Sequence, residues 1–500
     1  MSVHALAFTI AASTFGFAQS TLGASMDAMG GAAKLAGISS VEYTAVGTRA
    51  MVEQSERPTG PYFLDHYRIH EIRDEQHGRT RIDRSDEAYA ADRWWLQQAP
   101  PSVATSVIND GVVAALQNGA FAFAGISQQD QEQFAFSPER LLQTARAASD
   151  LYAGSDITLH GMRHHTLLFT WNGSPVTIYT NAATHLPWMV RWTRPYPYQT
   201  FLNPWGDVTT TLTYNSWTLE PYGIAYPREW TYERLGLPDQ QMAIVQLRIN
   251  PPLDDAKMIV PHEIYAAHHP VSRKVDEIPL GFGASSPPHE IVPGILQFSG
   301  GWNVAFIKQE DGIIVLEAPW SQHYTQQALT EAVKRYDLPV KAVITTSDSW
   351  PHIAGVRQAV AQRIPIYALD LNIDILERLL SNPHRMNPDL LARHPRKAMF
   401  RIVKDNLGVG TGKNRLEIIP YRSATGERQM MVYFPEHQLL YTSDLFAPDG
   451  NGGWFTPQYL RELQGAVERE HLVVKTIFGM HYEPTPYSEI SHYLKTFLGP

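Results

Sequence analysis

The chain has 500 residues, 44% of them hydrophobic, which is enough to bury two ordinary cores. Its 41 Lys and Arg against 50 Asp and Glu give a net charge of −9 without a long basic run, which excludes the clustered positive charge that nucleic-acid binding needs. It contains no cysteine, so disulfides and thiolate metal sites are excluded and any metal must be bound by His, Asp, Glu or water.

The first segment, Ala5 to Ala18, is apolar and rich in small residues, and the first basic residue is Lys34. It is too short to span a bilayer but has the length of a signal-peptide core, with Gly16-Phe17-Ala18 as a small-x-small cleavage site. We therefore expect a signal peptide within residues 1–25 and a periplasmic or secreted bacterial protein, which the lack of cysteine suits. The alternative is an apolar helix packed on the protein. No other stretch is apolar for long enough to predict a membrane span.

Residues 26–261 are predicted to form a β-rich domain. A short helix is expected over Met26 to Ile38, and a second helix is expected with Ser137 as its cap and Pro138 in its first turn. The Asn172-Gly173 pair predicts a tight hairpin between two strands. The predicted strands are 41–46, 66–72, 165–171, 176–180, 209–214, 217–219 and 244–249.

The connections between these strands include Leu186-Pro187, Trp205-Gly206-Asp207 and Tyr226-Pro227. This order of pieces resembles the half-barrel of bacterial lipoprotein-carrier proteins. The resemblance implies a concave apolar surface able to hold an acyl or aromatic group. The alternative is a sheet that only packs on its neighbouring domain.

Residues 262–293 are predicted to be a linker or an interdomain arm. This stretch has a loop-forming composition without a clear period, with Gly281-Phe282-Gly283 and Pro287-Pro288. The paired histidines His268 and His269 are expected to face solvent.

Residues 294–500 are predicted to form a second domain, because strands and helices alternate from Gly294 onward, as in α/β layer folds. The second strand ends in Glu317-Ala318-Pro319. The expected strands are 304–307, 313–316, 340–345, 364–369, 416–420, 429–434, 438–441 and 473–478, and the expected helices are 321–336, 352–363, 373–380 and one that begins at Thr456-Pro457.

The stretch from Lys341 to Gly355 carries the clearest chemical signal. Its apolar residues Val343 and Ile344 end in the polar loop Thr345-Thr346-Ser347-Asp348-Ser349-Trp350-Pro351-His352. Side chains at the carboxyl ends of such strands converge on one site in α/β folds. Two later strands are followed by Thr442-Ser443-Asp444-Leu445-Phe446 and by Gly479-Met480-His481.

Together these stretches resemble the metallo-β-lactamase fold, whose members carry Thr-His-x-His-x-Asp-His-x-Gly-Gly, Gly-Asp-Leu-Phe and Gly-x-His at the corresponding places. The resemblance covers residues 294–500 and implies an αβ/βα sandwich. We therefore predict an α+β chain, with an N-terminal half-barrel-like domain and this sandwich. In register, the two leading motif histidines fall on Ser347 and Ser349, the motif aspartate on Pro351, and the last histidine is kept as His352.

The resemblance implies two sets of metal ligands. One set needs the positions of Ser347 and Ser349 and a third histidine from Tyr421 to Gly426, where none occurs, so this site is expected to be empty. The other set keeps His352, Asp444 and His481, which suits one zinc ion, with non-haem iron or no metal as alternatives.

A metal there would polarise an ester, lactone or amide carbonyl and lower the pKa of its water. We therefore predict a metal-dependent hydrolase of a small molecule, with Asp348, His352 and Asp444 as catalytic residues. Asp348 is expected to assist by hydrogen-bonding a ligand histidine or the water. The aromatic residues Trp302, Trp350, Trp454 and Tyr482 are expected to bind the substrate, together with Trp320 and Phe455 beside them.

Two alternatives stay open. A pseudoenzyme would bind an apolar or aromatic ligand in the interdomain cleft, with His352, Asp444 and His481 as a hydrogen-bonded cluster. Serine chemistry would use Ser347 or Ser349 beside His352. The loop lacks the Gly-x-Ser-x-Gly elbow that supports such a nucleophile.

Overall fold

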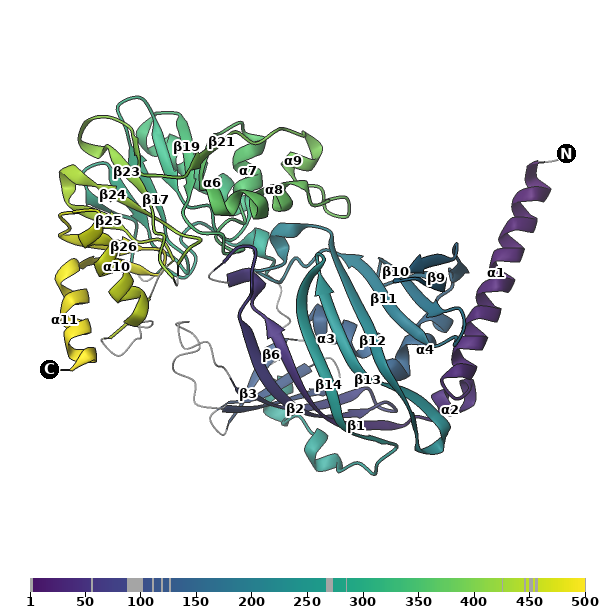
Figure 1. Cartoon of the computed structure of the whole chain (residues 1–500). Helices are drawn as coiled ribbons and strands as arrows, with labels where there is room; N and C mark the ends of the chain where they lie inside the picture. The colour runs from purple at the N-terminus through teal and green to yellow at the C-terminus, as the bar shows by residue number, and fades with distance from the viewer. Residues whose placement is uncertain are drawn as a thin grey trace.

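The structure of the chain is a computed structural model. It describes residues 3–54, 57–87, 102–109, 112–117, 120–125, 127–266, 273–284, 286–424, 426–444, 447–448, 453–454 and 457–499. Figure 1 shows two lobes, one that contains the chain up to α5 and one that contains the chain from β15 to the C-terminus. The predicted residues His268, His269, Leu445, Phe446 and Phe455 lie outside the described residues.

The N-terminal lobe is built on one 14-stranded sheet of antiparallel neighbours, in the order β6-β5-β4-β3-β2-β1-β14-β13-β12-β11-β10-β9-β7, with β8 beside β9. The first long strand pairs with the last one, so that Val41 lies opposite Ile249. The strands are β1 Ser40–Ala50, β2 Leu64–Asp74, β3 Arg79–Glu87, β4 Ser102–Asn109, β5 Val112–Gln117, β6 Ala120–Gly125, β7 Tyr152–Ala153, β8 Ile157–Leu159, β9 Met162–Trp171, β10 Ser174–Asn181, β11 Pro187–Arg194, β12 Val208–Glu220, β13 Ile224–Arg234 and β14 Leu237–Ile249.

The helices of this lobe are α1 Val3–Ala28, α2 Ala32–Ala36, α3 Gln128–Ala135, α4 Pro138–Ala147 and α5 His262–Ala266. Helices α3 and α4 lie on the concave side of the sheet, whereas α1 extends away from it at one end (Figure 1). Leu141 and Leu142 of α4 are buried with Trp192 of β11 and Tyr214 of β12 in one core. The predicted helix at Pro138 and the Asn172-Gly173 hairpin are both confirmed.

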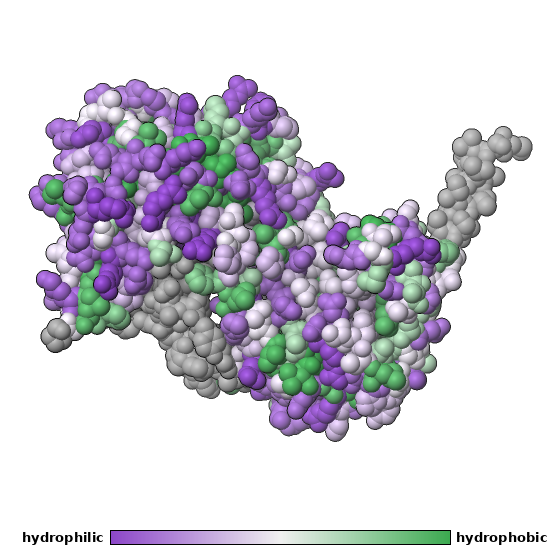
Figure 2. Space-filling view, viewed as in Figure 1, coloured by the Kyte–Doolittle hydropathy of each residue, from purple (hydrophilic) through white to green (hydrophobic). Residues whose placement is uncertain are grey.

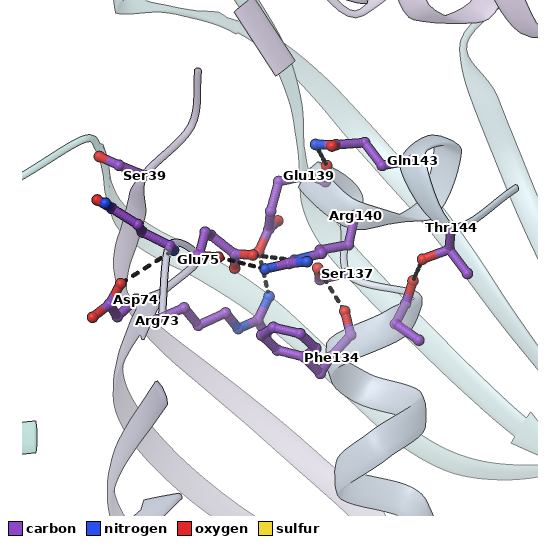
Figure 3. Close-up of polar contacts among 12 residues, drawn as sticks. Ser39, Arg73, Asp74, Glu75, Phe134, Ser137, Glu139, Arg140, Gln143 and Thr144 are labelled. Atoms are coloured by element: carbon purple, nitrogen blue, oxygen red, sulfur yellow. Dashed lines mark hydrogen bonds and ion pairs between the residues drawn. The ribbon is translucent and has the colours of Figure 1, made fainter. Parts of the chain in front are cut away.

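A buried ion network joins α4 to the sheet, as Figure 3 shows. The guanidinium of Arg73 on β2 lies 2.8 Å from Glu139 at the start of α4 and 2.6 Å from Glu71. Arg140, the next residue of α4, pairs with Glu75 just after β2. Because both carboxylates at Arg73 are buried, they need this paired charge, and the network fixes where α4 lies on the sheet.

The C-terminal lobe contains two further sheets. The 7-stranded sheet runs β15 to β21 in order, and the 6-stranded sheet runs β22 to β27 in order. The strands are β15 His289–Val292, β16 Ile295–Phe298, β17 Val304–Lys308, β18 Ile313–Leu316, β19 Val340–Thr345, β20 Ile366–Leu369, β21 Phe400–Val403, β22 Leu407–Val409, β23 Leu416–Pro420, β24 Met430–Phe434, β25 Leu439–Tyr441, β26 Thr476–Gly479 and β27 Tyr482–Pro486. The helices are α6 Gln322–Tyr336, α7 Val356–Ala361, α8 Ile373–Ser381, α9 Leu390–Arg393, α10 Pro457–Arg469 and α11 Tyr487–Leu498.

These sheets pack face to face with helices on their outer sides, because alternate residues of each strand enter different cores. Phe306 of β17 packs under α6, whereas its neighbour Ile307 packs against the second sheet. On β24, Val432 faces the first sheet and Met431 faces α10. Strands buried on both faces read as continuous apolar runs. The mixed α/β fold with large sheets is therefore confirmed.

The two lobes share a packed boundary. Trp205 and Val208 of the N-terminal lobe lie in the same core as Trp350 and Leu379 of the C-terminal lobe. The Asp207 carboxylate accepts hydrogen bonds from the backbone amides of Arg385 and Met386, at 2.7 and 3.1 Å. The large sheet ends at Ile249 and β15 begins at His289. The division into separately folding domains at 26–261 and 294–500 stays a prediction.

Two expectations about helices need correction or refinement. The helix expected from His352 begins only at Val356, because residues 350–355 form turns. The first helix continues through the expected leader to Ala28, and its residues Leu22 and Met26 are buried against the large sheet. Within the described residues, no helix combines the length and apolar character that a membrane span needs.

Hydrophilic side chains cover most of the visible face of the C-terminal lobe, as Figure 2 shows, with hydrophobic residues in small separate areas. A surface of this kind is ordinary for a folded domain in contact with water.

Candidate metal centre

The candidate site lies where the ends of strands from both C-terminal sheets meet. The loop after β19 carries Ser347, Asp348 and His352, the loop after β25 carries Asp444, and the turn between β26 and β27 carries His481. The Met430 amide at the start of β24 donates to the Thr346 carbonyl at 2.9 Å, which joins the two sheets at this edge. The convergence expected from the strand pattern is therefore present.

His352, Asp444 and His481 form one compact group. Each offers a ligand atom, and these atoms all lie within 4.8 Å of one another. Nε2 of His481 is 2.6 Å from Oδ1 of Asp444, and Nδ1 of His352 is 3.2 Å from Oδ2. His352 and Asp444 are buried, whereas His481 is partly exposed, so the group is accessible from the side of His481.

Hydrogen bonds between neighbouring loops hold this group in place. The Thr346 hydroxyl donates to the Ser443 hydroxyl at 2.7 Å, which joins the loop of His352 to the loop of Asp444. The Met480 amide donates to the Ser443 carbonyl at 3.1 Å. The Asn303 side chain donates to the carbonyls of Gly479 and Tyr482, each at 3.0 Å, and so fixes the turn that carries His481.

The two histidines hold Asp444 in its ionised form. Burial acts to raise the pKa of Asp444, but the charges and hydrogen bonds of His352 and His481 outweigh it and hold the pKa well below its usual range. Burial lowers the pKa of His352, against the opposing effect of Asp444. The group therefore offers an ionised carboxylate beside two imidazoles, which are donor types that bind metals.

The donor set fits a divalent ion. Two imidazole nitrogens and one carboxylate oxygen leave coordination positions open, as in catalytic zinc sites and in non-haem iron sites. Nδ1 of His352 faces Oδ2 of Asp444, whereas its Nε2 is buried and makes no hydrogen bond within the described residues. Buried polar atoms normally have a partner, and an ion at this group would provide one.

Arg428 is a further residue of the site that the sequence analysis did not single out. It is 6% exposed, and its guanidinium donates to Ser347 Oγ at 2.7 Å. Nη1 lies 3.1 Å from Oδ1 of Asp348, and Nη2 lies 3.5 Å from Oδ2 of Asp444. In the sequence, Arg428 is a basic residue just before the apolar strand β24. It follows closely on Tyr421 to Gly426, the segment in which the third metal-binding histidine of the motif is missing.

Asp348 is paired with Arg428 in the structure, and its expected role at the site stays a prediction. Its ion pair is with Arg428 and not with a ligand histidine, because the guanidinium lies between Asp348 and Asp444. Burial raises the pKa of Asp348 to about 6, although the charge of Arg428 opposes this shift.

The serines do not form an activated nucleophile. Ser347 Oγ accepts hydrogen bonds from Arg428 and from the Ser349 amide, the latter at 3.0 Å, so both of its acceptor positions are used. Within the described residues, neither the Ser347 hydroxyl nor the Ser349 hydroxyl is hydrogen-bonded to His352. This arrangement lacks the bond between nucleophile and base that serine catalysis requires.

Glu317 lies behind the site at the end of β18. Burial raises its pKa to about 8, although hydrogen bonds from Thr346 and Tyr441 oppose the shift, so the side chain is largely protonated at neutral pH. The Tyr441 hydroxyl is 3.2 Å from its carboxyl group. Glu317 therefore supports the loop of Thr346 instead of offering a charged ligand.

Trp302, one of the four aromatic residues expected to bind substrate, is in ring contact with the ligand group. Its ring lies edge-on to His352 with centroids 5.5 Å apart, and it packs on Trp320 at 3.9 Å. Trp350, by contrast, is 3% exposed and packs on Trp205. Trp454 and Tyr482 pack on each other in the core beneath α10. The substrate-binding role of these residues stays a prediction.

No family model matches the sequence, and no curated protein matches it. Among solved structures, the chain is similar to a metallo-beta-lactamase from Pontibacter korlensis, with 15% identity, a TM-score of 0.33 and coverage of 43% of this chain and 99% of that one. A metallo-beta-lactamase from Erythrobacter litoralis has 15% identity, a TM-score of 0.32 and coverage of 41% and 93%. The sec-alkylsulfatase Pisa1 from Pseudomonas sp. has 14% identity, a TM-score of 0.31 and coverage of 41% and 40%. These neighbours are metallo-β-lactamase fold proteins, and the likeness is distant.

Proposed function

We propose that this chain is an exported hydrolase with a single divalent ion, zinc, held by His352, Asp444 and His481. The observation that carries the proposal is the compact His-Asp-His group at the converging strand ends, in which Nε2 of His352 is buried and makes no hydrogen bond in the described part of the chain. Its substrate is a small molecule with an ester, lactone or amide carbonyl.

A bound zinc ion would supply a Lewis acid for the carbonyl and lower the pKa of a water molecule. The chain's own residues hold and orient the site. Asp444 is kept ionised by its two histidines, and Nη2 of Arg428 lies 3.5 Å from Oδ2 of that carboxylate. Partly exposed His481 marks the accessible side, and the ring of Trp302 offers an apolar surface beside His352.

The N-terminal lobe is proposed to contribute an open, curved sheet that holds an acyl or aromatic group. A cavity of about 240 Å³ lies between the sheet and α3, and its lining includes Tyr43, Trp230 and Tyr232 together with Arg73. The lining also includes the charged or polar side chains of Glu71, Arg84, Asp130 and Gln133, so a ligand with an apolar part and a polar end would suit it. Saturable binding of a fluorescent fatty acid, weakened by Trp230→Ala, would support this role, and no saturable binding would remove it.

A second function is favoured by one observation. Asp444 is already contacted by His352, His481 and Arg428, as a metal-free polar cluster would require. In that case the chain is a binding module, with ligand capture in place of turnover.

Hydrolysis assays separate these two functions. Purified protein is tested against aryl esters, lactones and anilides, with and without added zinc, beside Asp444→Asn and His481→Ala. The hydrolase predicts zinc-dependent turnover that falls at least 100-fold in both variants. Turnover that is absent, or that chelation and both variants leave unchanged, would overturn the proposal.

A further inference from the structure

Three oxygen-bearing side chains surround the guanidinium of Arg428. They are Ser347 at 2.7 Å, Asp348 at 3.1 Å and Asp444 at 3.5 Å. All three are buried, and so is Arg428. The guanidinium therefore occupies the centre of a small oxygen-lined position, with Asp444 as the side chain that this position shares with the His352–His481 group.

The buried carboxylates around Arg428 require a cation at this position. Asp348 and Asp444 are two carboxylates in one buried region, and uncompensated buried charge is strongly unfavourable. Arg428 neutralises one of these charges, and an ion held by His352, Asp444 and His481 would compensate the other. Oδ2 of Asp444 lies 3.2 Å from His352 and 3.5 Å from Arg428, so this carboxylate links two neighbouring cation positions.

The backbone around Arg428 is fixed for this role. The side chain of Asn372 donates to the Arg428 carbonyl at 2.8 Å. Its neighbour Glu427 points outward, where it pairs with the exposed Arg57 at 2.9 Å. Arg428 thus enters the site from the turn before β24, while the adjacent acidic residue stays at the surface.

We propose that Arg428 is a built-in second cation, which fills the position between Ser347, Asp348 and Asp444 so that the centre binds one metal ion and not two. The proposal rests on the proposed ion at His352, Asp444 and His481. A guanidinium is permanently charged and cannot dissociate into solvent, so the charge at this position is independent of metal supply. Arg428 is therefore a positioning residue that acts on the ion through Asp444.

The proposal predicts what happens when Arg428 is removed. The variant Arg428→Ala leaves two carboxylates and a hydroxyl around an open position. Oxygen ligands of this kind suit hard cations such as Mn²⁺, Mg²⁺ and Ca²⁺. The variant should therefore acquire a Mn²⁺ site that the unmodified chain lacks.

The test uses zinc-loaded full-length protein titrated with Mn²⁺, with free Mn²⁺ measured by its paramagnetic resonance signal. Arg428→Ala should bind about one additional Mn²⁺ at least tenfold more tightly than wild type, and Mn²⁺ should raise the Tm of this variant alone. Arg428→Lys keeps the charge and should behave as wild type. Arg57→Ala removes a cation next to Glu427 but outside the site, and this variant should bind no additional Mn²⁺. Arg428→Gln keeps a donor for Ser347 without the charge, and it replaces Arg428→Ala if that variant does not fold.

The outcomes distinguish this proposal from the function on which it rests. Zinc uptake by wild type together with a folded Arg428→Ala or Arg428→Gln that gains no Mn²⁺ would overturn the role of Arg428 alone. The same conclusion follows if Arg57→Ala gains as much Mn²⁺. A wild type that takes up no zinc, beside an Arg428→Ala that takes up Mn²⁺, would remove the zinc site but support Arg428 as the resident cation.

Discussion

Trp205 and Trp350 pack edge to face with ring centroids 4.7 Å apart, one from each lobe of the molecule. Trp350 lies two residues before His352, and its amide also donates to the Glu53 carbonyl of the N-terminal lobe at 3.2 Å. The N-terminal lobe therefore supports the loop that carries a candidate metal ligand.

Trp205→Ala should destabilise the protein by about 3–5 kcal/mol, because it empties a fully buried site. It should also weaken zinc binding, since the loop of His352 loses its support. Trp192→Ala is the matched control, because Trp192 is equally buried but lies in the core of the large sheet. Urea unfolding and zinc titration of both variants check this. Equal zinc affinity in the two variants would show that the lobes are not coupled in this way.

Gly355→Ala should lower the free energy of unfolding by about 2–3 kcal/mol. A Cβ at this position would lie 1.7 Å from Thr325 Oγ1 and 2.9 Å from the Ser321 carbonyl oxygen. The close contact lets the chain turn from His352 into α7 against α6. Gly465→Ala in α10 is the control, since a Cβ there meets nothing within 4 Å. This control should stabilise the protein by about 0.5–1 kcal/mol, because alanine favours the helix. A Gly355→Ala protein as stable as wild type, measured by urea unfolding, would contradict the packing described here.

His384 should make stability depend on pH at the boundary between the lobes. Burial first, and then the charge of Arg357, lower its pKa to about 4, although Asp389 and Asp207 oppose the shift. Between about pH 6.5 and 4 the unfolded chain binds a proton at His384 that the folded chain does not, so stability is lost as the pH falls through this window. The loss should reach about 2–3 kcal/mol.

Urea unfolding at pH 7, 6, 5 and 4.5 measures this loss. In His384→Gln the free energy of unfolding should change less steeply with pH within that window. Asp389 adds its own loss only at lower pH, because Arg357 overcomes the effect of burial and holds its pKa at about 2. If the free energy of unfolding of His384→Gln depends on pH as steeply as that of wild type, the pH dependence comes from other groups.

The sequence predicted those parts of the fold that depend on local pattern. The apolar residues Val343 and Ile344 lie on a buried strand, and the Asn172-Gly173 pair forms the expected hairpin turn. The candidate ligands His352, Asp444 and His481 also come together, because strand ends place them at one edge. Their roles in metal binding stay predictions.

Long-range contacts explain what the sequence could not show. The pairing of β1 with β14 joins residues about 200 positions apart and leaves no local signal. Arg428 reaches Ser347 and Asp348 from a distant turn, so its place in the site depends on the packing of two sheets. The helix after His352 begins late because Gly355 must first pass close to Thr325.

The metal content of the protein tests the central claim most directly. Full-length protein purified without chelator should contain about one equivalent of zinc by elemental analysis, and X-ray absorption should show two imidazole ligands. His352→Ala and His481→Ala should each lose the metal while keeping the fold. Metal-free wild-type protein whose affinity for added zinc is unchanged in both variants would contradict the claim.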